Sequence, residues 1–341
     1  MNGPTYLITG ATGFVGRHLL ETLSSQVPGA RLLALVRDAA AWDAMGWTRD
    51  LSNVETIVGT VTDPEGWRSD ARLEGLAGIF HMAALVRHTR EEAEEVYLTN
   101  VSGTLHMVRL AADMGCRLVH MSTSGTVGCF DHAEDTADEH APYCEDVVRN
   151  WPYYHSKIEA ERQARRLADE LEADLVIIRP PVLLGPGDHR FRSTGHIIKA
   201  MTRRLPFLIS GGIHFIDIRD ASRALVEAMR CDKARPVYHL SGTSCSIGDF
   251  FRMVEEISGV PKPPVELPYR PAWLLARATR KLGWLPDPVV IEMASKYWNV
   301  DSRYATEDLG YQSRDAYETL TDTVDWLRAN HAELMQPRAA A

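Results

Sequence analysis

The alternation of short apolar runs with longer amphipathic segments constrains the fold of this chain more than any other feature. Between the runs, apolar residues recur at helical spacing, as at Val96, Val101, Leu105 and Val108. Strands separated by helices imply crossover connections and a parallel sheet that is covered on both faces. The pattern therefore predicts an α/β fold built on a doubly wound parallel sheet.

The elements expected from this pattern lie mostly in the N-terminal half. The expected strands are 6–9, 31–36, 54–58, 78–82, 117–122 and 175–179, and the expected helices are 14–25, 91–114 and 153–171. Prolines and glycines interrupt the pattern after Arg179. Two later pieces, 214–218 and 237–241, are expected to return to the main sheet or its edge. The segment from about 246 to 335 is expected to be mostly helical.

The first expected strand runs directly into the sequence TGATGFVG and then into a helix. Gly10 permits the tight turn, Gly13 lets the backbone approach a diphosphate, and Gly16 lets the helix pack closely on the strand. The helix N-terminus offers N–H groups and partial positive charge to the phosphates. Glycines also occur in purely structural turns, but this strand–turn–helix context favours a Rossmann-type dinucleotide site.

The end of the second expected strand bears on the choice of cofactor. Arg37 can hold a 2′-phosphate, which favours NADP, whereas Asp38 is the competing residue that would favour NAD. Asp63 follows the third expected strand and is placed for the adenine amino group, although it could equally be a helix cap. We therefore expect NADP(H) as the cofactor, with NAD(H) as the alternative.

A tyrosine and a lysine spaced four residues apart point to proton transfer. Tyr153 and Lys157 share one helix face. A nearby ammonium lowers a phenol pKa by about three units at an effective dielectric constant near 20. Such a pair is usually only a solvated helix face. Here Ser122, Thr123 and Ser124 follow the fifth expected strand, at the edge where doubly wound folds bind ligands.

The charge and the cysteines exclude several classes of function. The chain has 37 basic and 46 acidic residues, a formal net charge of −9, which argues against a nucleic-acid partner. Five cysteines without a close pair form neither a disulfide framework nor a zinc site, and no metal site is expected. No apolar run approaches the roughly 18 residues of a spanning helix. We expect a cytoplasmic protein without an integral membrane segment.

Several motifs occur together in one order along residues 5–190. After the glycine triplet come His81-Met82-Ala83-Ala84, Asn100-Val101-Ser102-Gly103-Thr104, Ser122-Thr123-Ser124, Tyr153, Lys157, Arg179-Pro180-Pro181 and Gly185-Pro186-Gly187-Asp188. A further segment runs from Phe215 to Asp220. This set resembles the extended short-chain dehydrogenase/reductases, the NAD-dependent epimerase/dehydratase family. The resemblance is specific for fold and cofactor class, and weaker for the substrate beyond residue 240.

The resemblance implies a role for each catalytic candidate. Tyr153 would be the general acid/base, and Lys157 would hold the nicotinamide ribose and lower the tyrosine pKa. Ser124 would polarise the substrate oxygen, with Thr123 its rival in alignment. Asn100 matches a helix position associated with proton relay. The implied cofactor-binding residues are Gly10, Thr12, Gly13, Phe14, Val15, Gly16, Arg37, Asp63, Ala83, Ala84, Leu85, Ser122, Tyr153, Lys157, Pro180, Val182 and Leu183.

Within this family, Arg37, the run 122–127 and the segment 192–196 most resemble dihydroflavonol-reductase-like and 3β-hydroxysteroid-dehydrogenase-like members. We therefore expect an NADP-dependent oxidoreductase that interconverts a carbonyl and an alcohol. One alternative is a nucleotide-sugar epimerase or dehydratase with tightly bound NAD. Against it, the run 122–124 has no carboxylate for water loss, and Arg37 replaces the usual acidic strand end. The other alternative is a non-catalytic NADP-sensing protein.

The domain division and the partners are expected as follows. Residues 1–185 and 212–241 form an NADP-binding Rossmann domain, and residues 186–211 and 242–341 form a smaller, mostly helical substrate-binding domain. The substrate is a small carbonyl or alcohol, and a hydrophobic one if the segment 273–285 lines its pocket. That segment could also be a membrane-surface helix, or a core helix with a solvated basic face. The resemblance further implies a homodimer through helices 91–114 and 151–171.

Overall fold

A seven-stranded parallel sheet forms the centre of the computed structural model, which describes residues 3–280 and 285–335. The strand order is β10-β6-β5-β4-β1-β2-β3, and every neighbouring pair is parallel. The strands are β1 (Thr5–Thr9), β2 (Arg31–Val36), β3 (Val54–Val58), β4 (Gly78–His81), β5 (Arg117–Met121), β6 (Leu175–Arg179) and β10 (Val237–His239). The expected doubly wound parallel sheet is confirmed.

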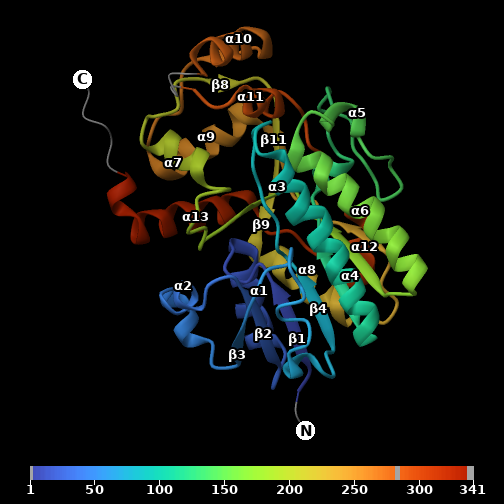
Figure 1. Ribbon diagram of the computed structural model, residues 1–341. Helices are drawn as coiled ribbons and strands as arrows, with labels where there is room; N and C mark the ends of the chain where they lie inside the picture. The colour runs from blue at the N-terminus through green and yellow to red at the C-terminus, as the bar shows by residue number, and fades with distance from the viewer. Residues whose placement is uncertain (1–2, 281–284, 336–341) are drawn as a thin grey trace.

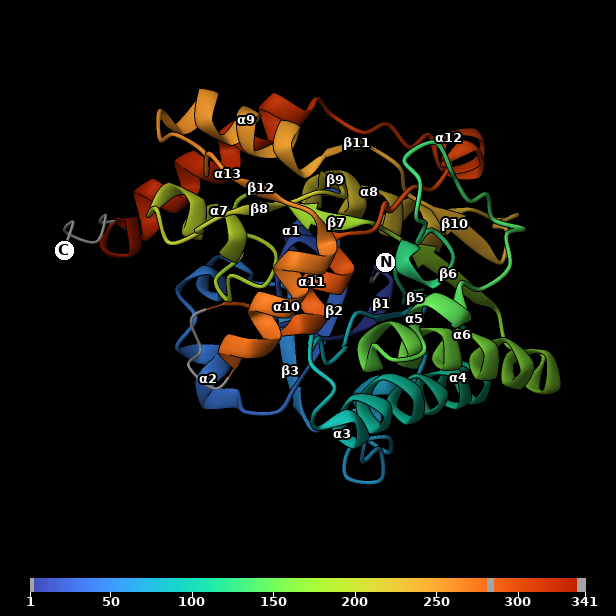
Figure 2. The same cartoon turned by 90° about the horizontal axis from the view of Figure 1, so that it is seen from above.

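Helices cover both faces of this sheet (Figures 1 and 2). On one face α3 (Ala93–Tyr97) and α4 (Gly103–Met114) pack against α6 (Pro152–Leu171). On the other face α1 (Phe14–Gln26) packs against α8 (Ile218–Arg230). Short helices α2 (Ala39–Asp43) and α5 (Glu145–Val148) lie in loops.

Alternate residues of each strand supply the two cores. Leu7 of β1 is fully buried in the cluster that contains Val108 of α4, whereas the next residue, Ile8, is buried in the cluster with Leu20 of α1. Because side chains of a strand alternate between the faces, a strand buried on both faces must be apolar throughout. This is why the sheet strands appear in the sequence as continuous apolar runs.

A second, three-stranded sheet of order β11-β9-β7 corrects one expectation. It contains β7 (Val182–Leu184), β9 (Gly212–Asp217) and β11 (Thr243–Ser246). The prediction that 214–218 returns to the main sheet is therefore wrong, while β10 does join the sheet edge beside β6. Pro180 and Pro181 end β6 because proline has no N–H to donate to a ladder. The chain then leaves the main sheet and starts a new one.

The C-terminal part is mostly helical, as expected, and lies above the carboxyl ends of the main strands (Figure 1). Its elements are α7 (Gly195–Met201), α9 (Ile247–Ser258), α10 (Tyr269–Thr279), α11 (Pro288–Ala294), α13 (Ala316–Asn330) and the strand pair β8 (Leu208–Ile209) with β12 (Glu266–Leu267). Phe250 and Leu320 centre a separate core there. In contrast, α12 (Arg303–Leu309) packs against β10 of the main sheet and against α8, which covers one face of that sheet. The proposed boundaries between the two domains stay a prediction.

Two helix predictions differ from the structure in detail. The expected helix 91–114 contains a π-helical segment, Leu98–Ser102, between α3 and α4. The expected segment 273–285 is helical only within α10, and residues 281–284 of that segment lie outside the described residues. Among the described residues, no helix combines the length and the apolar character needed to span a membrane.

The order of the strands reverses between β1 and β4, which makes their carboxyl ends the crevice of this fold. Gly10 follows β1 with φ +71°, and its Cα lies against the end of β4. A Cβ at this position would come within 2.6 Å of the Ala83 nitrogen. A residue without a side chain is therefore required for the chain to turn here.

We predict that Gly10→Ala lowers the free energy of unfolding by about 2 to 4 kcal/mol, because it adds a backbone clash to the cost of a positive φ. The matched control is Gly115→Ala. Gly115 has φ +61°, but an added methyl group would meet nothing within 4 Å, so its substitution should cost about 1 kcal/mol. Urea denaturation of both variants measures the difference. Equal losses would show that Gly10 is not tightly packed.

Candidate active site

The glycine-rich turn forms one wall of the crevice and fits a dinucleotide. The Gly13 N–H donates to the Gly10 carbonyl at 2.9 Å, and α1 begins directly afterwards. No side chain caps this helix and its first turn has no acidic residue, so its N–H groups are available to an anion. A Cβ on Gly13 would meet only the Gly10 carbonyl oxygen, at 3.2 Å. The turn thus leaves a cradle above Gly13 that a side chain would fill.

The other predicted residues of this segment occupy the same turn or the first turn of α1. Thr12 lies in the loop, whereas Phe14, Val15 and Gly16 begin the helix. A Cβ on Gly16 would come within 2.3 Å of the Gly10 carbonyl oxygen. Gly16 therefore lets α1 approach β1 closely, as the sequence predicts.

Arg37 and Asp38, the two residues at the end of β2 that bear on the choice of cofactor, have different contacts. The Asp38 carboxylate accepts a hydrogen bond from the Ala41 N–H at 3.1 Å and caps α2. The side chain of Arg37 is exposed. Asp63 is also exposed, and its N–H donates to the Thr60 carbonyl in the turn after β3. Because Asp38 already serves as a cap, Arg37 is the strand-end residue whose charge is available to a ligand.

A buried asparagine fixes the loop that follows β4. The Asn100 Oδ1 accepts from the Leu85 N–H at 2.8 Å, and its Nδ2 donates to the Leu85 carbonyl at 3.1 Å and to the Ser156 Oγ at 2.9 Å. The Ala83 N–H donates to the Thr9 hydroxyl at 3.2 Å. The segment of Ala83, Ala84 and Leu85 is thereby tied to both β1 and α6. The π-helical segment brings Asn100 to this position.

Tyr153 and Lys157 lie on the first turns of α6, which begins with Pro152 at a favourable helix-start position. Tyr153 is partly exposed, and its ring meets His88 edge-on at 5.8 Å between centroids. Lys157 is 2% exposed and its Nζ donates to the Met121 carbonyl at 2.8 Å. Burial raises the pKa of Tyr153 to about 12 and Lys157 does not contribute, so the expected lowering of this pKa is wrong. Burial also lowers the pKa of Lys157 to about 8, against the opposing effect of Glu161.

Of the three hydroxyls after β5, two have structural partners. The Ser122 hydroxyl donates to Glu161, and the Thr123 hydroxyl accepts from the Gly125 N–H at 3.2 Å. Ser124 is 2% exposed, and its backbone N–H donates to the Pro180 carbonyl at 2.8 Å, which joins the ends of β5 and β6. Because its two neighbours are engaged in structural bonds, Ser124 remains the candidate for contacting a substrate.

A buried ion pair that sequence reasoning missed lies directly behind these hydroxyls. Glu161 of α6 and Arg179 of β6 are 0% and 2% exposed, and the Arg179 Nε lies 3.1 Å from both carboxylate oxygens. Glu161 also accepts from Tyr143 at 3.1 Å, and Arg179 contacts the His239 ring at 3.1 Å. Burial alone would raise the pKa of Glu161, but the charge and hydrogen bonds of Arg179 hold that pKa below its usual value.

The spacing of Glu161 is the signal that could have found it. Glu161 follows Lys157 by four residues, as Lys157 follows Tyr153, so the three share one helix face. A carboxylate on a face that packs on the sheet needs a cation, and Arg179 ends a buried strand. The full set of hydrogen-bond partners of Glu161 could not be deduced from the sequence, because these partners come from distant segments.

The remaining predicted cofactor residues follow β6. Pro180 accepts the Ser124 hydrogen bond through its carbonyl, and Val182 and Leu183 form part of β7, paired with β9. Val182 is 37% exposed, whereas Leu183 is buried. The structure thus brings Tyr153, Lys157, the serine run and these residues to one edge of the sheet. Arg37 and Asp63 lie at the ends of β2 and β3, on the adenosine side expected for this fold.

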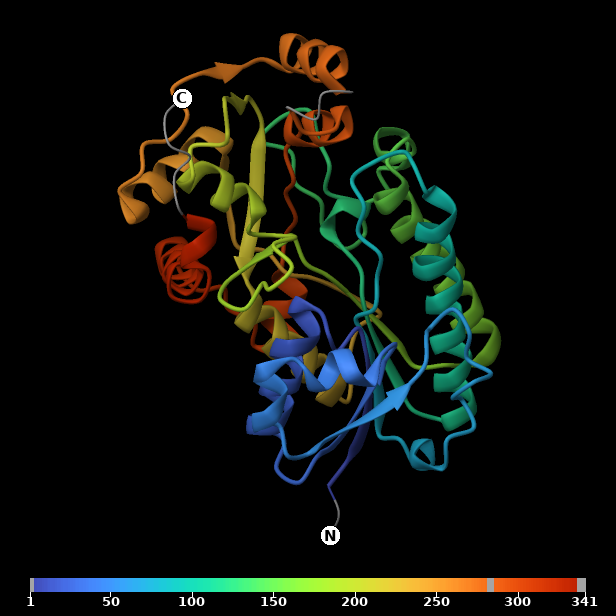
Figure 3. The same cartoon turned by 60° about the vertical axis from the view of Figure 1, so that its left-hand side comes forward.

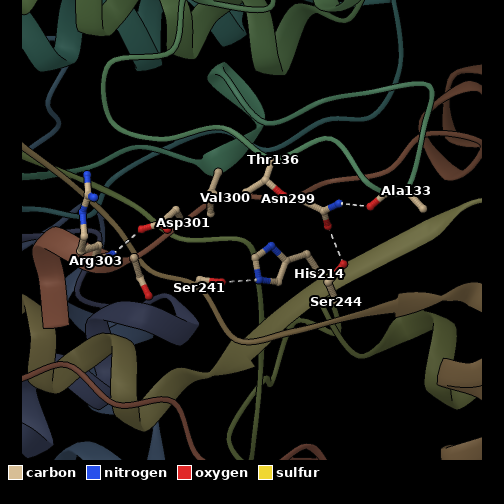
Figure 4. Close-up of a pocket in the computed structure, with 10 residues that line it drawn as sticks. Ala133, Thr136, His214, Ser241, Ser244, Asn299, Val300, Asp301 and Arg303 are labelled. Atoms are coloured by element: carbon tan, nitrogen blue, oxygen red, sulfur yellow. Dashed lines mark hydrogen bonds between the residues drawn. The ribbon is translucent and has the colours of Figure 1, made fainter.

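None of the predicted site residues lines the cavity of about 570 Å³ that Figure 4 shows. Its lining residues are Ala133, Thr136, His214, Ser241, Ser244, Asn299, Val300, Asp301, Ser302 and Arg303. Most of its polar groups already hold the loops together: Asn299 donates to the Ala133 carbonyl at 2.8 Å, and the Gly242 N–H donates to the His214 Nε2 at 2.9 Å. We interpret these contacts as the structural attachment of residues 133–137 to 299–303.

One group of potential metal ligands occurs among the residues that the structure describes. Glu145 of α5 lies close to His155 and Glu159 of α6, and all three are partly buried. Arg162 pairs with both carboxylates, and the Tyr97 hydroxyl bonds the His155 Nδ1. Ion pairing accounts for this cluster without a metal.

The sequence of the chain matches the model of the NAD dependent epimerase/dehydratase family over residues 6–241. The chain is 27% identical over 340 residues to the "Putative dihydroflavonol 4-reductase" of Synechocystis sp., covering 96% of this chain and 95% of that protein. It is 27% identical over 353 residues to "Sterol demethylase protein B" of Methylococcus capsulatus, covering 95% and 98%. The crystal structure of gox2253 is similar with a TM-score of 0.82 and 30% identity, covering 97% of this chain and 99% of that one.

We predict that Glu161→Gln lowers the free energy of unfolding by about 3 to 5 kcal/mol, because it leaves the buried Arg179 charge unpaired. The matched control is Glu170→Gln on the same helix. Glu170 forms only an exposed pair with Arg166, and its loss should cost less than about 0.5 kcal/mol. Urea denaturation tests both variants, and a small loss for Glu161→Gln would contradict the structural role.

A second prediction concerns acid stability. Burial lowers the pKa of His214 to about 4, so the unfolded chain binds a proton below about pH 6.5 that the folded chain does not. Stability is therefore lost as the pH falls below that value. Between about pH 6.5 and 5.5, the loss from this histidine should be about 1 kcal/mol. Denaturation at both pH values measures this loss of unfolding free energy. The loss should be smaller in His214→Asn than in the wild type, and unchanged in the surface variant His132→Asn.

Proposed function

The chain belongs to the NAD dependent epimerase/dehydratase family and is an NAD(P)-dependent enzyme, and on that basis we propose that it is an NADP-dependent oxidoreductase. It interconverts a carbonyl and an alcohol. When bound, the nicotinamide ring of the cofactor supplies or accepts the hydride. Tyr153, Lys157 and Ser124 transfer and position the proton.

One observation carries this choice among the reactions of the family. Tyr153 and Ser124 lie at the same sheet edge, and Glu161, the carboxylate that shares a helix face with Tyr153 and Lys157, is fully buried and paired with Arg179. A dehydration needs an additional acid and base beside the substrate. The hydroxyls of the site can bind a substrate oxygen, but the buried Glu161 carboxylate cannot act as that additional acid or base. This favours the interconversion of a carbonyl and an alcohol.

The pKa of Tyr153 favours the direction of reduction. With a pKa of about 12 the phenol is protonated at neutral pH and can donate to a carbonyl oxygen that gains negative charge. Lys157, with a pKa of about 8, is mostly charged at that pH and would hold the nicotinamide ribose. Ser124 would donate a second hydrogen bond to the same substrate oxygen. The reductase name of one relative agrees with this direction.

The choice of NADP rests on the end of β2. The Asp38 carboxylate is engaged in capping α2, whereas Arg37 is exposed. A guanidinium binds a phosphate through two parallel hydrogen bonds, and an acidic residue at this place would repel it. The cofactor would therefore carry a 2′-phosphate.

Aromatic side chains around Tyr153 support an apolar substrate. Tyr154 stacks on Trp298 at 5.0 Å between ring centroids, and His88 contacts the rings of both tyrosines. Burial lowers the pKa of His88 to about 4, with Arg192 acting in the same direction, so this histidine is neutral. An uncharged, aromatic wall suits a hydrophobic carbonyl compound better than a sugar nucleotide.

The alternatives make different demands on the protein. An epimerase or dehydratase would retain NAD through purification, and a sensor would bind NADPH without turnover. A sensor has no need of Tyr153, Lys157 and Ser124 as a proton-transfer set.

The homodimer and the cytoplasmic location stay predictions. Exposed Leu98 and Leu171, at 48% and 42%, lie on the helices expected at the dimer interface.

We predict that Tyr153→Phe lowers kcat with NADPH and a panel of hydrophobic ketones and aldehydes by about 10²- to 10⁴-fold, because it removes the proton donor. The Kd for NADPH should change little, since the phenol acts on the substrate. Steady-state kinetics and fluorescence titration of NADPH measure the two quantities.

The control is Tyr317→Phe on α13, where the exposed phenol donates to Glu256, and it should change kcat by less than about threefold. Turnover of Tyr153→Phe near that of the wild type would refute the mechanism. Tightly bound NAD in the purified protein would favour the epimerase or dehydratase alternative.

A further inference from the structure

The loop between β7 and α7 reaches across to the glycine-rich turn. The Pro186 carbonyl lies 2.7 Å from the His18 Nε2, and the His189 Nε2 lies 2.6 Å from the Arg17 Nη1. The Arg190 Nη2 donates to the Thr12 hydroxyl at 3.2 Å. In Figure 3 this yellow-green loop lies against the dark-blue N-terminal segment. Residues far apart in sequence therefore meet at the cofactor crevice.

A buried aspartate holds this loop in one shape. Asp188 is 1% exposed, and its carboxylate accepts from the N–H groups of Ser193 and Thr194 and from the Thr194 hydroxyl, at 2.9, 2.9 and 3.0 Å. His189 lies parallel to Trp47, with ring centroids 6.5 Å apart. Arg190 lies in the chain between His189, which packs on Trp47, and Ser193, which bonds Asp188. The fold of the loop therefore sets the position of Arg190 at the turn.

Three arginines gather here without acidic partners. Arg190 lies near Arg37 of the β2 end and Arg192 of its own loop. Burial lowers the pKa of Arg190, and the charges of these two neighbours lower it further. Within residues 3–280 and 285–335, none of the three guanidinium groups forms an ion pair with a carboxylate. Like charges held together in this way are stabilised by a bound anion.

We propose that Arg190 and Arg37 together bind the 2′-phosphate of NADP(H), one arginine from each side of the adenosine pocket. This assignment rests on the proposed function, and it adds a specificity-determining residue outside the β2 end. The diphosphate is served by the N–H groups at the start of α1. Arg190 instead contacts Thr12, and its charge interacts with that of Arg37 at the end of β2, the strand end that holds the adenosine ribose in this fold.

Binding of NADPH and NADH to the wild type and three variants tests this assignment. Arg190→Gln should raise the Kd for NADPH by about 10- to 100-fold, the effect of losing one or two charge-assisted hydrogen bonds. Its Kd for NADH should change by less than about threefold. Arg190→Lys keeps the charge but not the bidentate geometry, and should lie in between. Arg192→Gln, with no bond to the turn, should have a much smaller effect than Arg190→Gln.

The outcomes separate this inference from the proposed function. Equal losses for NADPH and NADH in Arg190→Gln would place Arg190 on the diphosphate and overturn the proposal, as would no loss at all. A wild type that binds NADH as tightly as NADPH would overturn the choice of NADP itself. Arg190 is exposed, so the thermal midpoint without cofactor should be unchanged, which excludes misfolding as the cause.

Discussion

The ion pair between Glu161 and Arg179 is the interaction on which the geometry of the site depends. It joins α6, which carries Tyr153 and Lys157, to β6, and through Ser122 it reaches the end of β5. Both charges are almost completely buried, so each is stable only in the presence of the other. A shift of α6 along the sheet would separate them. The pair therefore fixes the position of α6 along the sheet relative to the hydroxyls that follow β5.

The central sheet and helix α6 could be predicted because their signals are local. Leu7 and Ile8 face opposite cores, so the strand is apolar throughout, and the spacing of Tyr153 and Lys157 appears directly in the sequence. The strand β9 could not be assigned correctly, because its apolar run suits either sheet. Its partner β7 is only three residues long and follows two prolines, so no periodic pattern indicates it.

The residues that sequence reasoning misses act through partners distant in sequence. Arg190 is an ordinary exposed arginine until the loop fold places it 3.2 Å from Thr12, 178 residues earlier in the chain. The proton-relay role expected of Asn100 stays a prediction. Its oxygen and amide nitrogen are occupied by Leu85 and Ser156, which makes it a tether of the loop after β4. Composition and spacing describe residues that are neighbours along the chain. The contact of Arg190 with Thr12 and the contacts of Asn100 join residues that are not such neighbours.

The interleaving of the two sheets has a consequence for how the chain folds. The strand β9 of the small sheet precedes β10, which completes the edge of the large one. The large sheet thus cannot be finished until the chain has passed through β7 and β9 of the small sheet, and the small sheet is completed afterwards by β11. Contacts between segments so far apart in sequence slow folding, and a truncated chain ending before β10 would expose the edge of β6. Neither sheet is therefore built from one continuous stretch of the chain.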